Sequence, residues 1–213
     1  MSEPELSKDT STAPLSESRK KDILENLLPG IGLDGAETLL SYTQERPVEA
    51  GRILVAQGDK DTDLFLLLRG SFSVFEKIRI NQRDVVLQTA TFPAPGILGE
   101  VNLLMESARS ATVAAIEEAD VLVLTHASFL SLSEEHPKLA IEIVKCLGVA
   151  IHNRSVSFQH KVRGNILREG KTVEGGIAKL VRYIGKVSQC PETVTNKLFS
   201  ADFRSGARGF AMS

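Results

Sequence analysis

The sequence lacks several features that would assign it to a membrane or secreted class of protein. It has only two cysteines in 213 residues, Cys146 and Cys190, and their spacing fits neither a metal site nor a redox motif. Both are therefore predicted to be free thiols in a reducing cytoplasm. No uncharged apolar run approaches the roughly 18 residues of a membrane span, and residues 1–18 lack the apolar core of a signal peptide. We expect a cytoplasmic protein with no transmembrane segment.

Residues for a metal centre or a catalytic centre are also few. The four histidines are His126, His136, His152 and His160, and all of them follow the last predicted strand. They cannot line a barrel in the way that the metal ligands of a cupin enzyme do. No nucleophile with a neighbouring base is visible either. The sequence therefore predicts no enzymatic activity, no metal site and no cofactor.

Charge is divided unevenly along the chain. The net charge is −2, but residues 161–213 hold 10 basic and 4 acidic residues, a net of +6, which leaves −8 for residues 1–160. This asymmetry indicates either an anionic partner for the C-terminal part or docking onto the acidic part of the same chain. A solvated tail remains open as a third interpretation.

The first part of the chain predicts a tail and two helices. Residues 1–18 are rich in Ser, Thr, Pro, Glu and Asp, a composition typical of a disordered tail. Apolar residues then recur at helical spacing over residues 19–28 and 33–43, and Asp34 is the expected N-cap of the second helix.

From Gln44 onward, short β-rich runs alternate with turn signals. Gly51, Gly58 and Gly70 fall at the turns and are expected to adopt positive φ. Many short strands at this spacing predict a β-sandwich, a jelly roll or a barrel. The predicted strands cover residues 52–56, 64–68, 71–76, 85–90, 110–115 and 121–125.

Helices are predicted again after the strands. A short one covers residues 127–135, and a long one, with Pro137 in its first turn, covers residues 136–160. An apolar stripe along the long helix could pack on the β-domain, pair with a second copy in a homodimer, or do both. The stripe consists of Ala140, Val144, Leu147, Ile151 and Phe158. Residues 161–213 form a basic extension of unassigned function, in which a basic amphipathic helix over residues 177–187 could dock a protein partner or an anionic membrane surface.

The segment from Gly99 to Val113 carries the chemistry. A glycine–glutamate pair precedes an apolar stretch, and Arg109 follows nine residues after Glu100. An arginine fork matches a phosphate geometrically, a helix begun at Gly99-Glu100 would point backbone N–H groups at the same anion, and Gly99 permits close backbone approach. Glu100 suits a ribose hydroxyl donor, and Ser110 can add a hydroxyl contact to the phosphate.

Several motifs, in order, resemble those of the cyclic nucleotide-binding domain family. The resemblance covers roughly residues 20–160 and implies an α+β, mainly β fold: an eight-stranded antiparallel β-roll over residues 19–135, with N-terminal helices and a long C-terminal helix. It also implies that Glu100 grips the ribose and Arg109 the phosphate. The motifs are Gly51-x-Ile53, Gln57-Gly58-Asp59, the runs at 63–67 and 70–74, Gly99-Glu100, and the run at 109–113. The expected cyclic nucleotide-binding set is Gly99, Glu100, Val101, Asn102, Arg109, Ser110 and Ala111.

Departures from the family pattern leave the ligand open. Asn102 stands where the family usually has Ala or Gly, and Leu98 and Ala108 replace the usual Phe and Pro. We therefore expect cAMP or cGMP without choosing between them, and an internal salt bridge of Glu100 with Arg109 in a domain that has lost its ligand stays as the alternative.

Two functions are consistent with this sequence. The first is a cyclic nucleotide sensor that signals to a protein partner by moving helix 136–160. The second is a transcription regulator of the cAMP-receptor type, with an atypical or truncated DNA-binding end. A faint helix-turn-helix resemblance at 184–194 supports the second, but Pro191 falls where its second helix would begin, so DNA binding is the less favoured interpretation.

Overall fold

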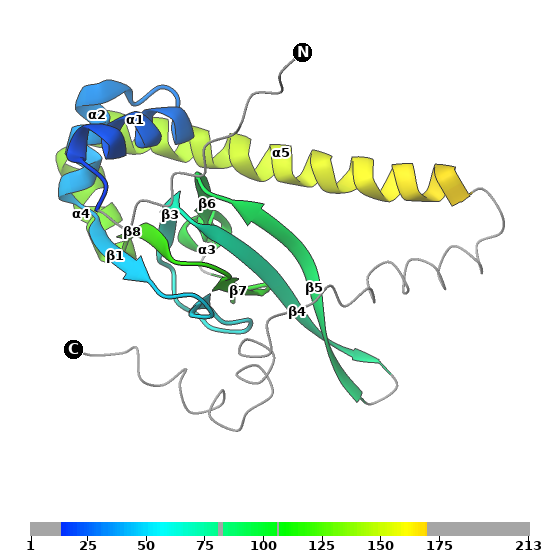
Figure 1. Ribbon diagram of the computed structural model, residues 1–213. Helices are drawn as coiled ribbons and strands as arrows, with labels where there is room; N and C mark the ends of the chain where they lie inside the picture. Colours follow the sequence, from blue (N-terminus) through cyan, green and yellow to red (C-terminus); the bar gives the residue numbers. More distant parts are fainter. Residues whose placement is uncertain (1–13, 81–82, 106, 170–213) are drawn as a thin grey trace, which may run out of the picture.

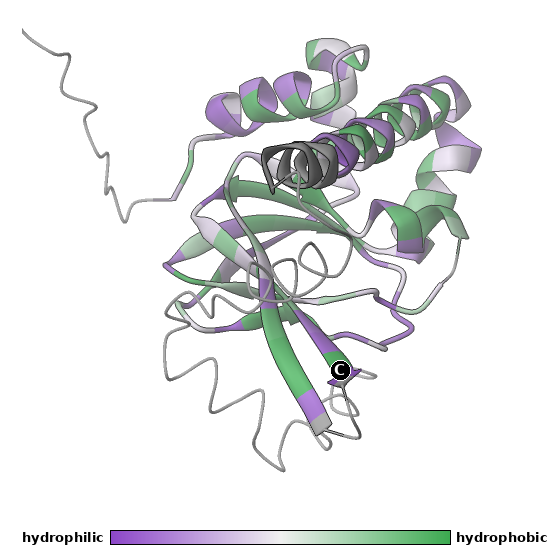
Figure 2. Cartoon of the chain, turned by 90° about the vertical axis from the view of Figure 1, so that its right-hand side faces the viewer, coloured by the Kyte–Doolittle hydropathy of each residue, from purple (hydrophilic) through white to green (hydrophobic). Residues whose placement is uncertain are grey.

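The computed structural model describes residues 14–80, 83–105 and 107–169. Within these residues, eight antiparallel strands form two four-stranded sheets that pack as a β-roll, and the helices cover one side of it (Figures 1 and 2). The predicted β-roll with N-terminal helices and a long C-terminal helix is confirmed. The first sheet has the order β1-β8-β3-β6, formed by Gln44–Val48, Ala119–Leu124, Leu64–Arg69 and Gly96–Leu98. The second has the order β2-β7-β4-β5, formed by Ile53–Val55, Thr112–Ala115, Ser71–Ile80 and Arg83–Pro93.

Strand β3 shows why the first sheet lies at the centre of the molecule. Its side chains alternate between two hydrophobic clusters, because successive residues of a strand point to opposite faces. Leu64, Leu66 and Leu68 pack with the helices, whereas Phe65 and Leu67 pack inside the roll. Both faces of β3 are therefore covered, which explains its uninterrupted apolar run.

The helical layer is formed by α1 (Glu17–Leu27), α2 (Gly32–Ser41), α4 (His126–Glu135) and α5 (Pro137–Glu169). Two of these helices begin with a side-chain cap: Ser16 accepts from the Arg19 N–H, and Thr125 accepts from the Ser128 N–H at 3.1 Å. Ile143 and Leu147 of α5 are fully buried in the cluster that includes Leu24 and Leu28. Helix α5 then continues past the roll (Figure 1).

The apolar stripe predicted on the long helix divides between two environments. Ala140 and Leu147 are buried against the rest of the domain, whereas Val144 is 38% exposed. Ile141, one turn before, is 55% exposed. Packing on the β-domain is therefore confirmed for one side of α5, and pairing with a second copy stays a prediction.

The helix boundaries correct four expectations. Glu17 and Ser18 belong to the first turn of α1 and not to the tail. Asp34 is not an N-cap: Ile31 already has helical backbone angles and α2 begins at Gly32, so Asp34 lies inside its first turn. Helix α5 begins at Pro137 and runs to Glu169, nine residues beyond the predicted end at 160, so the extension starts later than 161. The rest of the predicted tail at 1–13 and the predicted helix at 177–187 lie outside the described residues.

Two strands were missed by the sequence patterns. Strand β1 contains Pro47 and three polar residues, which a strand tolerates because β1 lies at an edge of its sheet. Strand β6 has only three residues, and it begins at a glycine, Gly96, directly after Pro95. The positive φ predicted for Gly51, Gly58 and Gly70 is confirmed at 79°, 91° and 102°.

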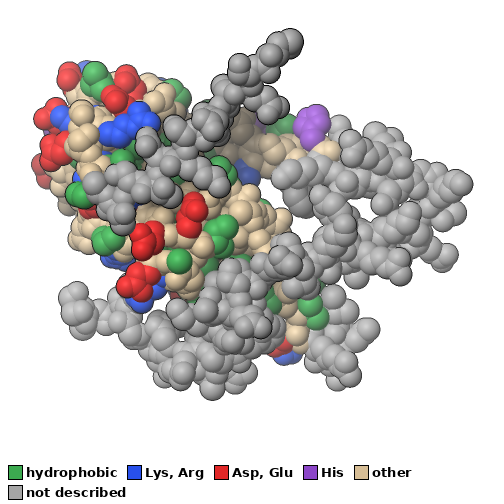
Figure 3. Space-filling view, in the orientation of Figure 1, with side chains coloured by type: hydrophobic (Ala, Val, Ile, Leu, Met, Phe, Trp, Pro, Cys, Tyr) green, Lys and Arg blue, Asp and Glu red, His purple; other side chains and the backbone are tan. Residues whose placement is uncertain are grey.

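Charged side chains of both signs cover the face over α1, α2 and β1 (Figure 3). Lys20 pairs with Glu45 there, and Lys21 with Glu37 at 2.8 Å. Across the described ranges, we find no helix that is both long enough and apolar enough to cross a membrane. A search of the same ranges finds no group of three or more His, Cys, Asp or Glu that could hold a metal ion.

Candidate nucleotide-binding site

The site is built where the segment before β7 meets the loop between β2 and β3. The Arg109 N–H donates to the Asp59 carbonyl at 2.8 Å, and the Gly58 N–H donates to the Arg109 carbonyl at 2.9 Å. These backbone bonds fix the Cα of Arg109, and its side chain then extends along the loop. The Arg109 Cζ lies 5.6 Å from the centre of the Phe65 ring, within the range of a cation–π contact.

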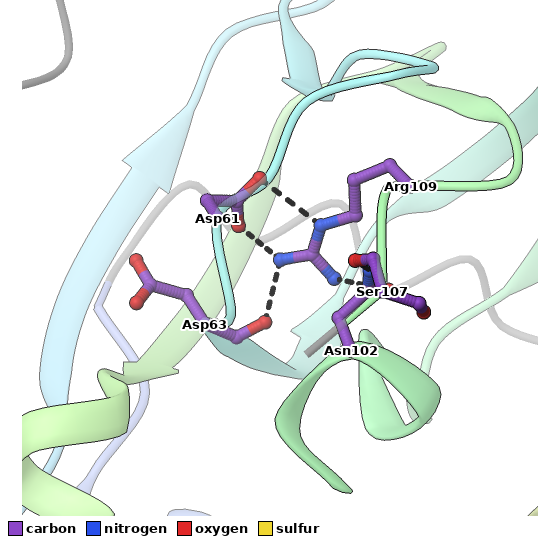
Figure 4. A network of polar contacts seen from close by, with 5 residues as sticks. All are labelled: Asp61, Asp63, Asn102, Ser107 and Arg109. Atoms are coloured by element: carbon purple, nitrogen blue, oxygen red, sulfur yellow. Dashed lines mark hydrogen bonds and ion pairs between the residues drawn. The ribbon is translucent and has the colours of Figure 1, made fainter. Parts of the chain in front are cut away.

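The guanidinium of Arg109 is held on several sides, as Figure 4 shows. Nε donates to Asp61 Oδ2 at 3.1 Å, and Nη2 donates to Asp61 Oδ1 and, at 2.7 Å, to the Asp63 carbonyl. Nη1 donates to Asn102 Oδ1 at 3.1 Å. The Arg109 side chain is only 3% exposed, whereas that of Asp61 is 39% exposed. A buried cation is thus paired with a carboxylate that is partly exposed to solvent.

Gly99 is required by the close approach of this guanidinium. Its φ is +86°, and a Cβ at this position would come well inside 3.0 Å of both Arg109 Nη1 and the Asp63 carbonyl. The sequence predicted close backbone approach at Gly99. In the structure, it is the arginine itself that approaches.

Glu100 is buried beside this cluster and has a different cationic partner. It begins the short helix α3 (Glu100–Met105), and it is 3% exposed. Its Oε1 accepts from Arg154 Nη1 at 2.7 Å, while Arg154 Nη2 donates to the Ile97 carbonyl at 2.9 Å. Oε2 is buried and has no hydrogen-bond partner among the residues that the structure describes. The internal salt bridge of Glu100 with Arg109 is therefore not the arrangement found.

Asn102 acts within the protein scaffold of the site. It is 6% exposed, its Nδ2 donates to the Ser107 carbonyl, and its Oδ1 accepts from Arg109. An amide can donate and accept at once, so Asn102 joins α3 to the segment that carries the arginine.

The predicted ligand-binding residues are thus brought together only in part. Gly99, Asn102 and Arg109 are in contact, and Glu100 follows Gly99 directly. Val101 is 36% exposed on α3, Ser110 is exposed, and Ala111 is half-buried. The ligand roles of all seven residues stay predictions.

Negative charge is crowded in the loop that holds Arg109. Burial, followed by the charge of Asp61, raises the pKa of both Asp59 and Asp63, and the charge of Arg109 offsets this only partly. The Asp63 carboxylate also accepts the backbone N–H of His126. Each added anion in this loop therefore has an electrostatic cost.

Two residues of the site were missed from sequence, Asp61 and Arg154. Asp61 lies in the alternating run Asp59-Lys60-Asp61-Thr62-Asp63, which indicates a polar turn but not which acid meets an arginine. Arg154 stands seven residues, about two helical turns, after the buried Leu147. That spacing places it on the packed side of α5 and was a usable signal.

The comparison with known proteins assigns the family. The family model described as the cyclic nucleotide-binding domain matches residues 45–136. These residues belong to the cyclic nucleotide-binding domain family. The matched region contains Gly99, Glu100 and Arg109. It also contains all eight described strands in full, apart from Gln44, the first residue of β1.

Relatives of this cyclic nucleotide-binding domain occur in proteins of different lengths. The chain is 30% identical over 122 residues to the cyclic AMP receptor protein of Thermus thermophilus, covering 57% of this chain and 55% of that protein. It is 33% identical over 125 residues to lysophospholipase nte1 of Neurospora crassa, covering 58% of this chain but only 8% of the fungal protein. The chain therefore matches about half of the first relative and less than a tenth of the second.

A solved structure shows the same fold. A cyclic nucleotide-binding domain from Methylobacillus flagellatus superposes with a TM-score of 0.63 at 22% identity, covering 70% of this chain and 84% of the other. At this identity, the likeness concerns the fold alone.

Proposed function

We propose that this chain is a non-enzymatic cytoplasmic sensor that binds a cyclic nucleotide, cAMP or cGMP, at Glu100 and Arg109. The coarser statement, a cyclic nucleotide-binding domain of the kind found in regulatory proteins, rests on the family match and on relatives such as the Thermus protein. The choice of ligand, the residue roles and the signalling step are the proposal.

The observation that carries the proposal is the buried second oxygen of Glu100. Oε2 has no hydrogen-bond partner among the described residues, although Oε1 is held by Arg154. Leaving a buried polar atom unpaired has a free-energy cost, so such an atom in a folded protein calls for an explanation. A ribose 2′-hydroxyl is a donor of the right kind, and it would be gripped by a carboxylate whose other oxygen is already fixed.

Arg109 supports the phosphate half of the same ligand. Its guanidinium lies against Gly99, the residue before Glu100, so a cation and a free acceptor adjoin along one short stretch of backbone. A cyclic phosphodiester carries one negative charge and a ribose hydroxyl, which matches this pair in both charge and hydrogen bonding.

The contact of Arg154 with Glu100 suggests how binding is signalled. Arg154 belongs to α5, and its Nη1 bonds to the carboxylate proposed to grip the ribose. A ligand that changes the charge or position of Glu100 changes the stability of this contact. It therefore shifts the equilibrium between two positions of α5, and the size of the shift is set by the difference in ligand affinity between them. Exposed Ile141 and Val144 on α5 support the further proposal that the moving helix belongs to a homodimer or meets a protein partner.

Calorimetry with cAMP, cGMP and a cyclic dinucleotide tests the binding proposal. Arg109→Ala is expected to weaken binding by about 2–5 kcal/mol, because half of a buried charge pair is lost. Arg79→Ala is the matched control: Arg79 is 73% exposed on the β4–β5 hairpin, and its loss should change affinity by less than about 0.5 kcal/mol. Circular dichroism checks that both variants fold. Heat from none of the three ligands, with the wild type and with an Asp61→Asn variant alike, would refute the sensor function.

A second candidate is a nucleotide-controlled regulator that binds DNA. The observation that favours it is the net charge of +6 over residues 161–213, together with the relative named cyclic AMP receptor protein. An electrophoretic shift with random duplex DNA over a series of salt concentrations tests this candidate. Affinity that falls with salt and is lost on removal of residues 170–213 would favour it, and no shift at low salt would exclude it.

A further inference from the structure

One edge of Arg109 that could bind a phosphate is already occupied in this protein. Nε and Nη2 form one of the two edges of a guanidinium that can bind two oxygens of one anion at once, the other being Nη1 with Nη2. Both donate to the carboxylate of Asp61. The remaining contacts go to the Asp63 carbonyl and to Asn102, and neither of these partners carries a charge at the contacting atom. Asp61 is thus the anion that neutralises Arg109.

Asp61 is the solvent-exposed partner of this ion pair. The arginine side chain is 3% exposed, and that of Asp61 is 39% exposed. Asn102, on the other side of the guanidinium, is 6% exposed. Of these three side chains, that of Asp61 therefore has the largest fraction of its surface in contact with solvent.

Asp61 and a bound phosphate would repel each other if both stayed on Arg109. The loop is already crowded with negative charge, since burial and Asp61 together raise the pKa of Asp59 and of Asp63. A second anion beside Asp61 would add to this repulsion within a partly desolvated region, where charges interact more strongly than in water. Exchange of one anion for the other keeps the charge on the guanidinium balanced.

We propose that Asp61 is an internal anion that holds the phosphate-binding edge of Arg109 until a cyclic nucleotide displaces it. The inference rests on the proposed function and adds to it the residue that sets affinity and selectivity. Ligand binding then has a competitor built into the chain. A nucleoside without phosphate cannot displace Asp61, so the site discriminates in favour of the phosphodiester. Once displaced, the Asp61 carboxylate is free to turn toward solvent.

Titration of the full chain with cAMP and cGMP, for wild type and for three variants, tests this proposal. Asp61→Asn removes the charge but keeps the size, and it is expected to tighten binding of whichever nucleotide binds by about tenfold or more, because a charged acceptor competes more strongly than a neutral one. Asp61→Glu keeps the charge and should bind within about threefold of wild type, since the competing charge that the proposal invokes is retained.

Asp59→Asn is the matched control for this experiment. Asp59 lies in the same loop and has the same charge, but it meets Arg109 through its backbone carbonyl. Its substitution should change affinity by less than about threefold, since it leaves the edge of the guanidinium occupied. A general effect of charge in the loop would instead move both asparagine variants equally, and this would overturn the proposal.

The outcomes separate this inference from the proposed function. Wild-type binding that Asp61→Asn leaves unchanged or weakens would show that Asp61 only positions Arg109, so the inference would fail while the sensor function stands. Binding by Asp61→Asn with none by wild type would support the proposal in its strongest form. Absence of binding by both would refute the sensor function and the inference with it.

Discussion

The tight contact at Gly99 gives a sharp test of the site's architecture. Gly99→Ala places a Cβ against Arg109 Nη1 and the Asp63 carbonyl, and one of these two is backbone that cannot move aside easily. Gly58→Ala is a matched control, because its φ of +91° is close to the +86° of Gly99, but its Cβ would meet nothing within 4 Å. The two variants share the strain of positive φ and differ in the collision.

The expected magnitudes follow from these geometries. Positive φ in a residue other than glycine destabilises the folded state by about 1–3 kcal/mol. Alanine also lowers the conformational entropy of the unfolded chain relative to glycine, which offsets about 0.4–1 kcal/mol of this loss. Both effects are common to the two variants. The collision at Gly99 adds about 1–3 kcal/mol, the usual cost of overpacking. Gly99→Ala should therefore lower the free energy of unfolding by about 1–3 kcal/mol more than Gly58→Ala.

Urea unfolding of both variants, with unchanged m-values, measures this difference. Because the guanidinium must move to accept the Cβ, Gly99→Ala should also weaken cyclic nucleotide binding. Equal destabilisation by the two substitutions, within about 0.5 kcal/mol, would refute the close approach of Arg109 to residue 99 on which the site is built.

Three further substitutions test the helix and the charges around the site. Arg154→Ala should destabilise the ligand-free protein by about 1–2 kcal/mol, less than for a fully buried pair because Arg154 is 54% exposed; in a double-mutant cycle with Glu100→Gln the two losses should not add. Asp63→Asn should stabilise the protein at pH 7, because burial and Asp61 raise the pKa of the Asp63 carboxyl above 3.8. Ionised Asp63 therefore disfavours folding. In unfolding curves, the gain in free energy of unfolding of Asp63→Asn should shrink as the pH falls through the pKa of Asp63 in the folded protein, and it should be gone below about pH 3.8. Leu147→Ala, at a fully buried position, should lower the free energy of unfolding by about 2–5 kcal/mol, and a loss under 1 kcal/mol would contradict the packing of α5.

The sequence predicts the fold well where a local pattern decides it. The apolar run of β3 predicts a strand and the glycines predict turns, because an apolar run and a positive φ each depend on only a few neighbouring residues. Strand β1 was missed because its polar residues and Pro47 are acceptable only at an edge, and the edge is set by strands far away in sequence. The end of α5 at Glu169 was missed for a related reason: its apolar stripe ends before the helix does.

The sequence predicted which residues form the site better than it predicted which residues they contact. Glu100 and Arg109 follow from a local motif, and the need for glycine at position 99 follows from the same motif. Their partners do not, because Asp61 comes from a loop 48 residues before Arg109 and Arg154 from a helix 54 residues after Glu100. Such contacts depend on how the roll and α5 pack, and this packing is determined by the whole core.

The length of α5 gives the contact at Arg154 a mechanical consequence. The helix has 33 residues, so it is about 50 Å long at 1.5 Å per residue. Arg154 lies 15 residues before its end at Glu169, a lever arm of roughly 22 Å. A tilt of about 10° at the Glu100 contact would carry the far end through about 4 Å, given that rise per residue. In the proposed signalling step, a rearrangement of one side chain at Glu100 would thus displace the far end of α5, well outside the roll, by a distance comparable to the spacing between neighbouring strands.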